Sequence, residues 1–457
     1  MSTAGGFAAG ELDIRFVREH PDVIRRGAQA KNIAVDLDAL LALDARRRQL
    51  HTQIQDLTTE QNRLSKQIGL LMGRFQAQKD PQKRAALEAE GDVASLRRQS
   101  AALKQQAAAL QQEQRELEPR IDALLLTVPM PPDADVPPGR SSEDNVEIRR
   151  WGTPPTFDFT PRSHMELAGS LGLIDVPRGT NVAGARSYFL VGAGALLHQA
   201  VLRLALDMMV FEKGFQPLTV PVLVRAEAMR ATGFFPAGRE QAYRVGEINE
   251  TAEEERFLTG TGEVGLTAWR RDEILEEADL PLKLVTVSTC FRREAGTYGK
   301  DTAGLYRLHQ FDKVEQVIIC RNSREESIRW HEQMLANSEQ VLQRLNLPYR
   351  VMQCCTGDLG PKNASMIDLE TWMPSRGAYG ETHSASRLYD FQARRCNLRY
   401  RTAQGEVAFC HTLNNTVIAS PRILIPILEL YQNADGSITV PEALRGHMGG
   451  MTVIRHA

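Results

Sequence analysis

The chain has 457 residues, a formal net charge of −2 at pH 7, 42% hydrophobic residues and 25% charged residues. These values are ordinary for globular proteins, and they exclude a wholly disordered chain, a collagen and a bundle of membrane helices. The near-neutral charge gives no general reason to bind nucleic acid, so such a site would require a local cluster of basic residues.

The N-terminus has no apolar segment behind a basic start in its first fifteen residues, so we expect no secretory signal. The longest apolar stretch, 188–211, is interrupted by polar and charged residues, which argues against a membrane span of about 20 apolar residues. We therefore expect a cytoplasmic protein with no membrane partner. The six cysteines form no CxxC pair, which predicts free thiols rather than a disulfide framework or a zinc ribbon.

Leucines recur every seven residues in two N-terminal segments, 43–71 and 96–124. A sustained heptad repeat predicts a helix with one apolar seam, and two such helices bury their seams against each other. Gly73 and Pro81 lie between the segments and would end the first helix. The sequence therefore predicts an antiparallel two-helix coiled-coil arm.

The predicted arm is basic. Residues 46–104 contain twelve Lys and Arg against six Asp and Glu, an excess of six positive charges. These side chains could simply solvate the outer faces of the coiled coil, or they could form a surface that contacts a phosphate backbone. The candidates are Arg46, Arg47, Arg48, Arg63, Lys66, Arg97, Arg98 and Lys104.

A change of composition follows the arm. Seven of the 22 prolines lie in 129–155, which is typical of a linker. Beyond it, short β-rich runs alternate with helical patterns, which predicts a compact α+β domain. We therefore expect an arm at 1–128, a Pro-rich linker at 129–155 and a second domain at 156–457.

The usual phosphate-binding loops are not supported. The GxG at Gly192 and Gly194 lacks its third glycine, and Gly299 and Lys300 are followed by Asp301 instead of Ser or Thr. The most unusual segment is 291–315, FRREAGTYGKDTAGLYRLHQFDKVE, which predicts two strands joined by a long loop. Its arginines suit phosphate or carboxylate recognition, although an exposed hairpin of salt bridges would show the same composition.

This segment closely resembles motif 2 of class II aminoacyl-tRNA synthetases, in the form found in bacterial-type seryl-tRNA synthetases. KGFQPLTVPVLV at 213–224 resembles motif 1, and TGTGEV at 259–264 resembles the family's TxE serine loop. GETHSAS at 380–386 resembles the metal and ATP strand, and HTLNNTVIASPRILIPILELYQ at 411–432 resembles motif 3. The basic arm matches the N-terminal tRNA-binding domain, so the resemblance spans essentially the whole chain.

The resemblance implies an antiparallel β-sheet with flanking helices in the second domain, and a serine–tRNA ligase activity. The chain would activate L-serine with ATP to seryl-adenylate and transfer the seryl group to tRNA(Ser), and to tRNA(Sec) where that tRNA is present. Two alternatives are an amino-acid ligase that loads a carrier protein and an inactive paralogue that binds RNA. The intact arm argues against the first, and the complete set of motif residues argues against the second.

The resemblance also implies roles for single residues. Arg292 and Arg422 would be catalytic. The serine pocket would contain Thr261, Glu263, Arg292, Glu315, Asn414 and Thr416. ATP would contact Arg292, Glu294, Phe311, Glu381, Ser384 and Arg422, with Phe311 and Arg422 on either side of adenine. Glu381 and Ser384 would hold Mg²⁺, whose preferred ligands are oxygen atoms. The tRNA contacts of the arm would be Arg46, Arg47, Arg63, Lys66, Arg97 and Arg98.

Three further expectations follow. Pro221 occupies the place of the motif 1 proline, which implies a homodimer. His309, His383 and His411 lack the spacing of metal ligands, so we expect no zinc. The TxE loop departs from the family, because Gly262 replaces a common Ala and Gly265 a common Pro, and both changes predict a more flexible loop.

Overall fold

The computed structural model describes residues 12–82, 93–246, 255–296 and 304–456. The chain forms two compact units. One contains residues 14–21 and 34–128, and the other contains residues 22–33 and 129–457 together with the first residues up to Asp13.

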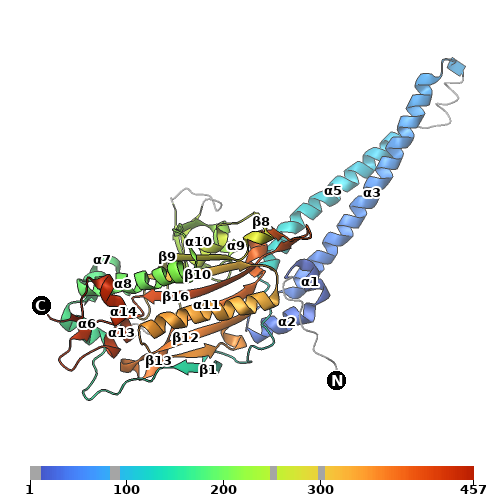
Figure 1. Cartoon of the computed structure of the whole chain (residues 1–457). Coiled ribbons are helices and arrows are strands. Elements are labelled where there is room, and N and C mark those ends of the chain that lie inside the picture. The colour runs from blue at the N-terminus through green and yellow to red at the C-terminus, as the bar shows by residue number, and fades with distance from the viewer. Residues whose placement is uncertain (1–11, 83–92, 247–254, 297–303, 457) are drawn as a thin grey trace, which may run out of the picture. The chain divides into compact units, whose positions relative to one another are not determined.

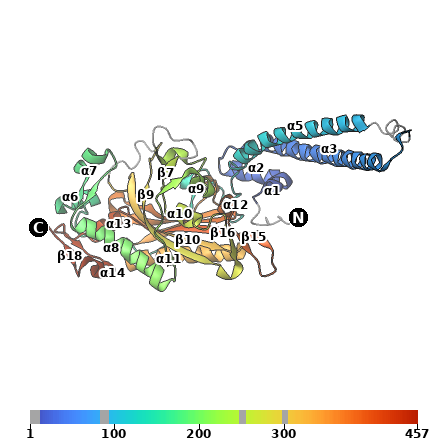
Figure 2. The same ribbon diagram turned by 90° about the horizontal axis from the view of Figure 1, so that it is seen from above.

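The first unit is a helical hairpin. Helix α1 (Ile14–Glu19) precedes two long helices, α3 (Leu37–Ala77) and α5 (Val93–Leu125), which run side by side in Figures 1 and 2. Asp36 caps α3 by accepting a hydrogen bond from the backbone N–H of Ala39 at 3.0 Å. At 1.5 Å per residue, the 41 residues of α3 span roughly 60 Å.

The leucine seam holds this hairpin together. Leu50, Leu64 and Leu117 are buried between α3 and α5, and the other heptad leucines are half-buried. The predicted coiled-coil arm is therefore confirmed, because the heptad pattern places all these side chains on one face of each helix.

The second unit is built on an eight-stranded sheet of order β1-β11-β12-β13-β16-β10-β9-β4. All neighbouring strands are antiparallel except β4 and β9, which are parallel. The antiparallel sheet with flanking helices that the sequence predicted is confirmed. The strands are β1 (Val146–Trp151), β11 (Tyr349–Gln353), β12 (Ser365–Met373), β13 (Ala378–Tyr389), β16 (His411–Ser420), β10 (Gln310–Cys320), β9 (Leu282–Phe291) and β4 (Gln216–Pro217).

Helices cover the two faces of this sheet unequally. Helices α8 (Ala193–Asp207) and α11 (Arg324–Arg344) lie on one face, which contains the main core (Figure 2). The shorter α10 (Glu263–Ala268) and α12 (Phe391–Arg395) pack on part of the other face. Among the described residues, no helix covers the rest of that second face, which leaves room for a site there.

Smaller elements complete the two units. They are α2 (Pro21–Ala30), α6 (His164–Leu171), β2 (Ile174–Asp175), α7 (Val176–Ala183), β3 (Phe189–Leu190), β5 (Leu223–Arg225), α9 (Ala226–Ala231), β6 (Tyr243–Val245), β7 (Arg256–Leu258), β8 (Ile274–Glu276), β14 (Arg399–Arg401), β15 (Val407–Phe409), α13 (Leu424–Leu430), β17 (Ile438–Thr439), α14 (Glu442–Arg445) and β18 (Val453–Ile454).

The Pro-rich segment 129–155 and the early segment 22–33 pack within the second unit. The C-terminal part of the Pro-rich segment forms edge strand β1, which pairs with β11. Gly27 lies against Pro131, and a Cβ at position 27 would be 3.3 Å from the Pro131 Cα. Parts of both segments therefore contact the sheet-containing unit. The functional boundaries at 128 and 155 remain a prediction.

One helical stretch among the described residues, Ala193–Glu212, is long and apolar enough to cross a membrane. Its residues Leu197, Val201 and Ala205 are buried in the main core. This burial is typical of the core helix of a globular domain, and the stretch is interrupted by charged side chains as the sequence indicated.

Candidate active site

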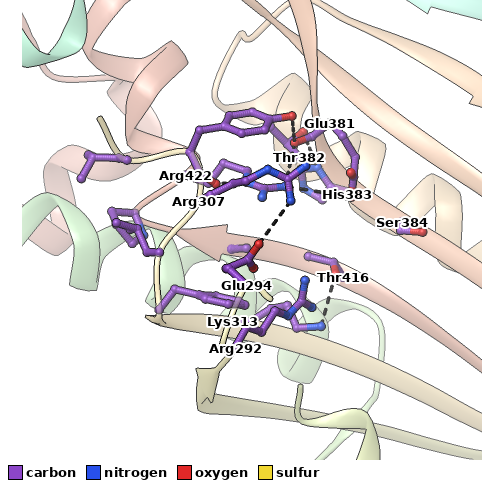
Figure 3. A pocket seen from close by; sticks show the side chains of 16 residues that line it. Arg292, Glu294, Arg307, Lys313, Glu381, Thr382, His383, Ser384, Thr416 and Arg422 are labelled. Carbon is purple, nitrogen blue, oxygen red and sulfur yellow. Dashed lines mark hydrogen bonds and ion pairs between the residues drawn. The ribbon is translucent and has the colours of Figure 1, made fainter. Parts of the chain in front are cut away.

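A pocket opens on the helix-free part of the sheet, where β10, β13 and β16 meet the end of β9 (Figure 3). Every residue predicted to contact ATP lines it. The lining residues are Arg292, Glu294, Leu305, Tyr306, Arg307, Leu308, Phe311, Lys313, Glu381, Thr382, His383, Ser384, Thr416, Ala419, Pro421 and Arg422.

Strand β10 supplies three alternate side chains to this face. Because side chains alternate along a strand, Phe311, Lys313 and Glu315 point to the pocket side, while Val314 and Ile318 enter the main core. Lys313 was not singled out from the sequence as a site residue. Its place between Phe311 and Glu315 at a spacing of two was the signal that could have identified it.

Lys313 and Glu315 form a buried ion pair. The Lys313 Nζ lies 2.5 Å from Glu315 Oε2 and donates a hydrogen bond of 2.7 Å to Thr261 Oγ1. Asn414 Nδ2 and Thr416 Oγ1 each donate to the Glu315 carboxylate at 3.4 Å. Burial raises the pKa of Glu315, and the neighbouring Lys313 opposes this shift. The structure thus brings Thr261, Glu315, Asn414 and Thr416 together, as expected for a polar pocket.

Glu263 occupies the first turn of α10 and is 2% exposed. Its Oε1 accepts hydrogen bonds from Lys362 Nζ at 2.5 Å and from Gln392 Nε2 at 2.7 Å. Neither partner was proposed from the sequence as a site residue. Gln392 belongs to helix α12, whereas Lys362 lies in none of the motifs and is 99 positions from Glu263.

The two unusual glycines of the TxE loop are tightly packed. A Cβ at Gly262 would lie 2.5 Å from Thr286 Cγ2, and a Cβ at Gly265 would lie 2.5 Å from Val220 Cβ. Larger neighbours therefore fill the space that side chains at these two positions would need. The prediction of a more flexible loop gains no support, because Val264 and Leu266 beside these glycines are fully buried.

Arg292 follows the last residue of β9 and is exposed to the pocket. Its guanidinium lies 5.2 Å from the centre of the Phe311 ring, and Nε donates to the carbonyl of Gly260 at 3.3 Å. An exposed guanidinium beside an aromatic ring offers both a cation and a stacking surface.

Glu294 has a positive φ of 52°, a conformation that costs free energy for a residue other than glycine. Strain of this kind persists where the surroundings enforce it, commonly at functional sites. The Glu294 carboxylate accepts a hydrogen bond from Arg307 Nη1 at 3.3 Å, as Figure 3 shows. Arg307 also lines the pocket and was not predicted as a site residue.

Arg422, just after β16, lies across the pocket from Arg292. Its guanidinium is 4.3 Å from the centre of the Tyr306 ring and donates to the carbonyls of Tyr306 at 3.0 Å and Glu381 at 3.1 Å. Phe311 and Arg422 line the same pocket, but their cation–π partners are Arg292 and Tyr306 respectively.

Oxygen ligands for a cation gather on β12 and β13. Ser384 of β13 pairs in register with Asp368 of β12, and Glu381 lies on the same part of β13. Asp368 is 8% exposed, and its Oδ1 has no hydrogen-bond partner among the described residues. Burial and the nearby Glu381 charge raise the pKa of Asp368 well above its usual range. An orphaned buried oxygen beside Glu381 and Ser384 fits a divalent cation.

A second group with possible ligand atoms includes the same aspartate. Cys354, Asp358 and Asp368 have potential ligand atoms within 4.8 Å of one another. Asp358 already accepts a hydrogen bond from Asn145 at 2.8 Å. This group shares Asp368 with the oxygen cluster of Glu381 and Ser384.

The histidines near the motifs are engaged by protein groups. His309 Nδ1 lies 2.9 Å from the carbonyl of Arg292, His383 Nε2 lies 3.0 Å from that of Val417, and His411 Nδ1 lies 2.8 Å from Ser327 Oγ. Burial lowers the pKa of His383 to about 4 and that of His411 to about 3.

The basic residues of the arm differ in their surroundings. Arg46 forms two hydrogen bonds across the hairpin to Glu113, at 2.7 and 2.8 Å, and Arg47 pairs with Asp44 and Glu118. Arg63 pairs with Glu60 on the same helix. Lys66, Arg97 and Arg98 are exposed, and Lys66 forms no ion pair within the part of the chain that the structure describes. Three of the predicted tRNA contacts, Arg46, Arg47 and Arg63, are therefore paired with carboxylates within the arm.

Two family models match the chain. Residues 12–132 match the seryl-tRNA synthetase N-terminal domain, and residues 243–431 match the class II tRNA synthetase core domain for G, H, P, S and T. The first match covers the arm, and the second covers the strands that line the pocket.

Relatives and solved structures agree with these matches. A serine–tRNA ligase of Deinococcus radiodurans is 43% identical over 97% of this chain and 99% of its own length. One from Thermomicrobium roseum is 42% identical over 96% of this chain and 94% of its own. The Pyrococcus horikoshii seryl-tRNA synthetase complexed with ATP superimposes with a TM-score of 0.87 at 34% identity, covering 98% of this chain and all of that one.

Proposed function

The chain belongs to the seryl-tRNA synthetases, and we propose that the pocket between β9, β10, β13 and β16 is where it activates serine. As a serine–tRNA ligase it activates L-serine with ATP to seryl-adenylate, with release of pyrophosphate, and then charges tRNA with the seryl group. The observation that carries the location is the convergence of Arg292, Glu294, Glu381 and Arg422 on one pocket, beside the Glu315 pair.

The first step joins two negatively charged groups. A carboxylate oxygen of serine attacks the α-phosphorus of ATP, an O–P bond forms, and the bond to the bridging oxygen breaks so that pyrophosphate leaves. Arg292 is the exposed cation that can stabilise both the carboxylate and the α-phosphate as charge develops. Arg422 on the opposite side can take up the charge of the outer phosphates.

The adenosine part of ATP would occupy the aromatic side of the pocket. Phe311 offers a flat face for adenine, and Arg422 can close over it once it leaves the ring of Tyr306. Glu294, whose strained backbone fixes its direction, can accept hydrogen bonds from the base in place of Arg307.

Serine selectivity would come from buried polar partners. Thr261, Glu263, Glu315, Asn414 and Thr416 surround a small polar space in which an analogue without the hydroxyl leaves hydrogen-bonding groups unpaired. The second step requires the terminal ribose hydroxyl of tRNA to attack the seryl carbonyl, and AMP leaves. Positioning, rather than a dedicated general base, would supply most of the acceleration.

Glu381 and Ser384 would hold Mg²⁺, supported by the buried carboxylate of Asp368. The bound ion would neutralise phosphate charge during activation. The Glu381 side chain is about half exposed and can turn toward a nucleotide.

The arm would bind the backbone of tRNA through its exposed cations. Arg63, Lys66, Arg97 and Arg98 are the predicted contacts that are exposed, and phosphate contacts of this kind need no base readout. We further propose a cytoplasmic homodimer, in which the segment around Pro221 contributes to a two-fold interface. Light scattering on active enzyme at micromolar concentration tests this, and a mass of one chain would contradict it.

The decisive assay is serine-dependent exchange of labelled pyrophosphate into ATP, followed by charging of total tRNA. Exchange with serine and subsequent charging support the proposed site. Exchange without any charging would instead favour a ligase that loads a carrier, and the absence of both would favour an inactive paralogue.

A further inference from the structure

The segment 360–364, between the turn at Thr356–Asp358 and β12, is fixed by a buried lysine from the N-terminal part of the chain. Lys31 is 3% exposed, and its Nζ donates to the carbonyls of Gly360 at 3.0 Å and Asn363 at 2.5 Å. Burial lowers the pKa of Lys31 to about 7. A buried amine is costly unless it is hydrogen-bonded, so these two contacts tie Lys31 firmly to the segment.

Backbone hydrogen bonds hold the same segment on both sides. The N–H of Met130 donates to the carbonyl of Pro361 and that of Asp133 donates to the carbonyl of Ala364, both at 2.8 Å. The N–H of Ala364 donates to the carbonyl of Arg387 in β13, also at 2.8 Å. The carbonyls of residues 360, 361, 363 and 364 therefore all have partners, and the backbone around Lys362 has little freedom to move.

Lys362 points from this fixed segment to the proposed serine pocket. Its Nζ lies 2.5 Å from Glu263 Oε1 and 4.0 Å from the centre of the Phe234 ring. The side chain is 14% exposed, and that of Glu263 is 3% exposed. An ion pair this well shielded from water is much stronger than a surface pair, and loss of one partner leaves the other uncompensated.

We infer that Lys362 is a positioning residue for serine binding, which holds the Glu263 carboxylate in its orientation, and that Lys31 fixes the backbone from which Lys362 extends. The inference rests on the proposed role of Glu263 in the serine pocket. It assigns to residues 22–33 and 129–133 a second role, because they support the activation site in addition to leading into the arm.

The charges around Glu263 explain why Lys362 matters. Gln392 of α12 is neutral, and Glu315 of β10 is a like charge whose own pKa is raised in part by Glu263. Lys313 is committed to Glu315 and Thr261. Among these neighbours, Lys362 is the cation in contact with Glu263. Without it, the buried Glu263 carboxylate would lose its charged hydrogen-bond donor and the contact that fixes its orientation.

The test uses the full-length enzyme and pyrophosphate exchange, with KM for serine and KM for ATP measured separately. Lys362→Met removes the charge and keeps the length of the side chain. We expect KM for serine to rise about 10- to 100-fold, because the buried Glu263 carboxylate loses its charged partner. KM for ATP should change less than about twofold, because no ATP-site contact is lost.

Three variants complete the design. Lys362→Arg keeps the charge and should restore most of the serine affinity. Lys31→Met removes the buried tie and should raise KM for serine by a smaller factor. Lys283→Met is the matched control, because its Nζ also lies over an aromatic ring and donates one backbone hydrogen bond, but it lies outside the pocket.

The outcomes distinguish failure of the proposed activation site from failure of the role inferred for Lys362. A wild-type enzyme without serine-dependent exchange would overturn the proposed site itself. An active wild type, with an unchanged KM for serine in Lys362→Met, would overturn only this inference. If circular dichroism shows that Lys362→Met does not fold, Lys31→Met decides: a raised KM for serine with normal KM for ATP supports the inference, and an unchanged KM for serine overturns it.

Discussion

The Lys313 ammonium lies 2.5 Å from the Glu315 carboxylate, and the two side chains are 7% and 1% exposed. Two residues apart on β10, they point to the same face and are paired with each other. The proposed serine pocket therefore contains compensated charges, and a substrate ammonium must share carboxylates that already have lysine partners.

Glu315→Gln should lower both stability and serine-dependent exchange. The change leaves the Lys313 ammonium buried without its counter-ion, which typically costs about 3–5 kcal/mol of unfolding free energy. The double variant Lys313→Met/Glu315→Gln removes both charges and should recover most of the stability but none of the exchange. Urea unfolding and pyrophosphate exchange measure the two effects. If the double variant is as unstable as Glu315→Gln alone, the unpaired Lys313 ammonium is not the cause of the lost stability.

Arg292→Ala should abolish activation and leave the fold intact. The side chain is exposed, so its loss removes little packing, but it removes a cation where charge develops. Loss of one preorganised donor typically costs about 3 kcal/mol, or two to three decades in rate. Arg293→Ala is the control, because that neighbouring arginine donates to the Glu240 carbonyl and does not line the main pocket. Exchange above half of the wild-type rate in Arg292→Ala would contradict its assignment.

Stability should fall as the pH drops below neutrality. Burial lowers the pKa of His331 and His383 to about 4 and that of His411 to about 3, compared with about 6.5 in the unfolded chain. Their contribution is therefore fully present above pH 6.5 and is lost as the pH falls toward 4. Near pH 5 the unfolded state binds about three more protons, a slope of about 4 kcal/mol per pH unit.

Urea unfolding at pH 7, 6 and 5 measures this slope. His331→Gln should reduce it by about a third, because the glutamine can donate to the carbonyl of Ala385 without titrating. A urea midpoint that stays constant from pH 7 to 5 would show that the three buried histidines do not control acid stability.

The double variant Lys66→Gln/Arg97→Gln should weaken tRNA charging while leaving pyrophosphate exchange unchanged. Both side chains are exposed on the arm, and glutamine retains helix propensity. If each contacts one phosphate, the slope of log affinity against log salt should flatten by about two. Arg178→Gln/Arg203→Gln removes two exposed charges from the other unit as a control. An unchanged KM for tRNA and an unchanged salt slope would mean that these cations only solvate the arm.

The arm and the sheet side of the pocket could be predicted from the sequence because their signals are local. The heptad leucines place one seam on α3 and α5 wherever the helices form. Likewise, the alternation along β10 places Phe311 and Glu315 on one face. The motif residues around Arg292 and Arg422 were recognised from short segments, and the family of the chain followed from them.

Contacts between distant segments were decided only by the tertiary structure. Lys362 lies 99 positions from Glu263, and Lys31 lies 332 positions from Asn363, so no local pattern connects either pair. The packing around Gly262 and Gly265 was also decided only by the tertiary structure. Thr286 and Val220 occupy the space that side chains at these two positions would need.

The positive charge of the arm was likewise predicted from the sequence, whereas the ion pairs of its cations depended on the tertiary structure. The sequence established that the arm carries an excess of positive charge, but not which cations are free to bind a partner. Packing of α3 against α5 brings Glu113 to Arg46, and so removes that arginine from the exposed set while leaving Lys66 in it. Local periodicity determines which face a side chain occupies, whereas its partner depends on which distant segment folds against that face.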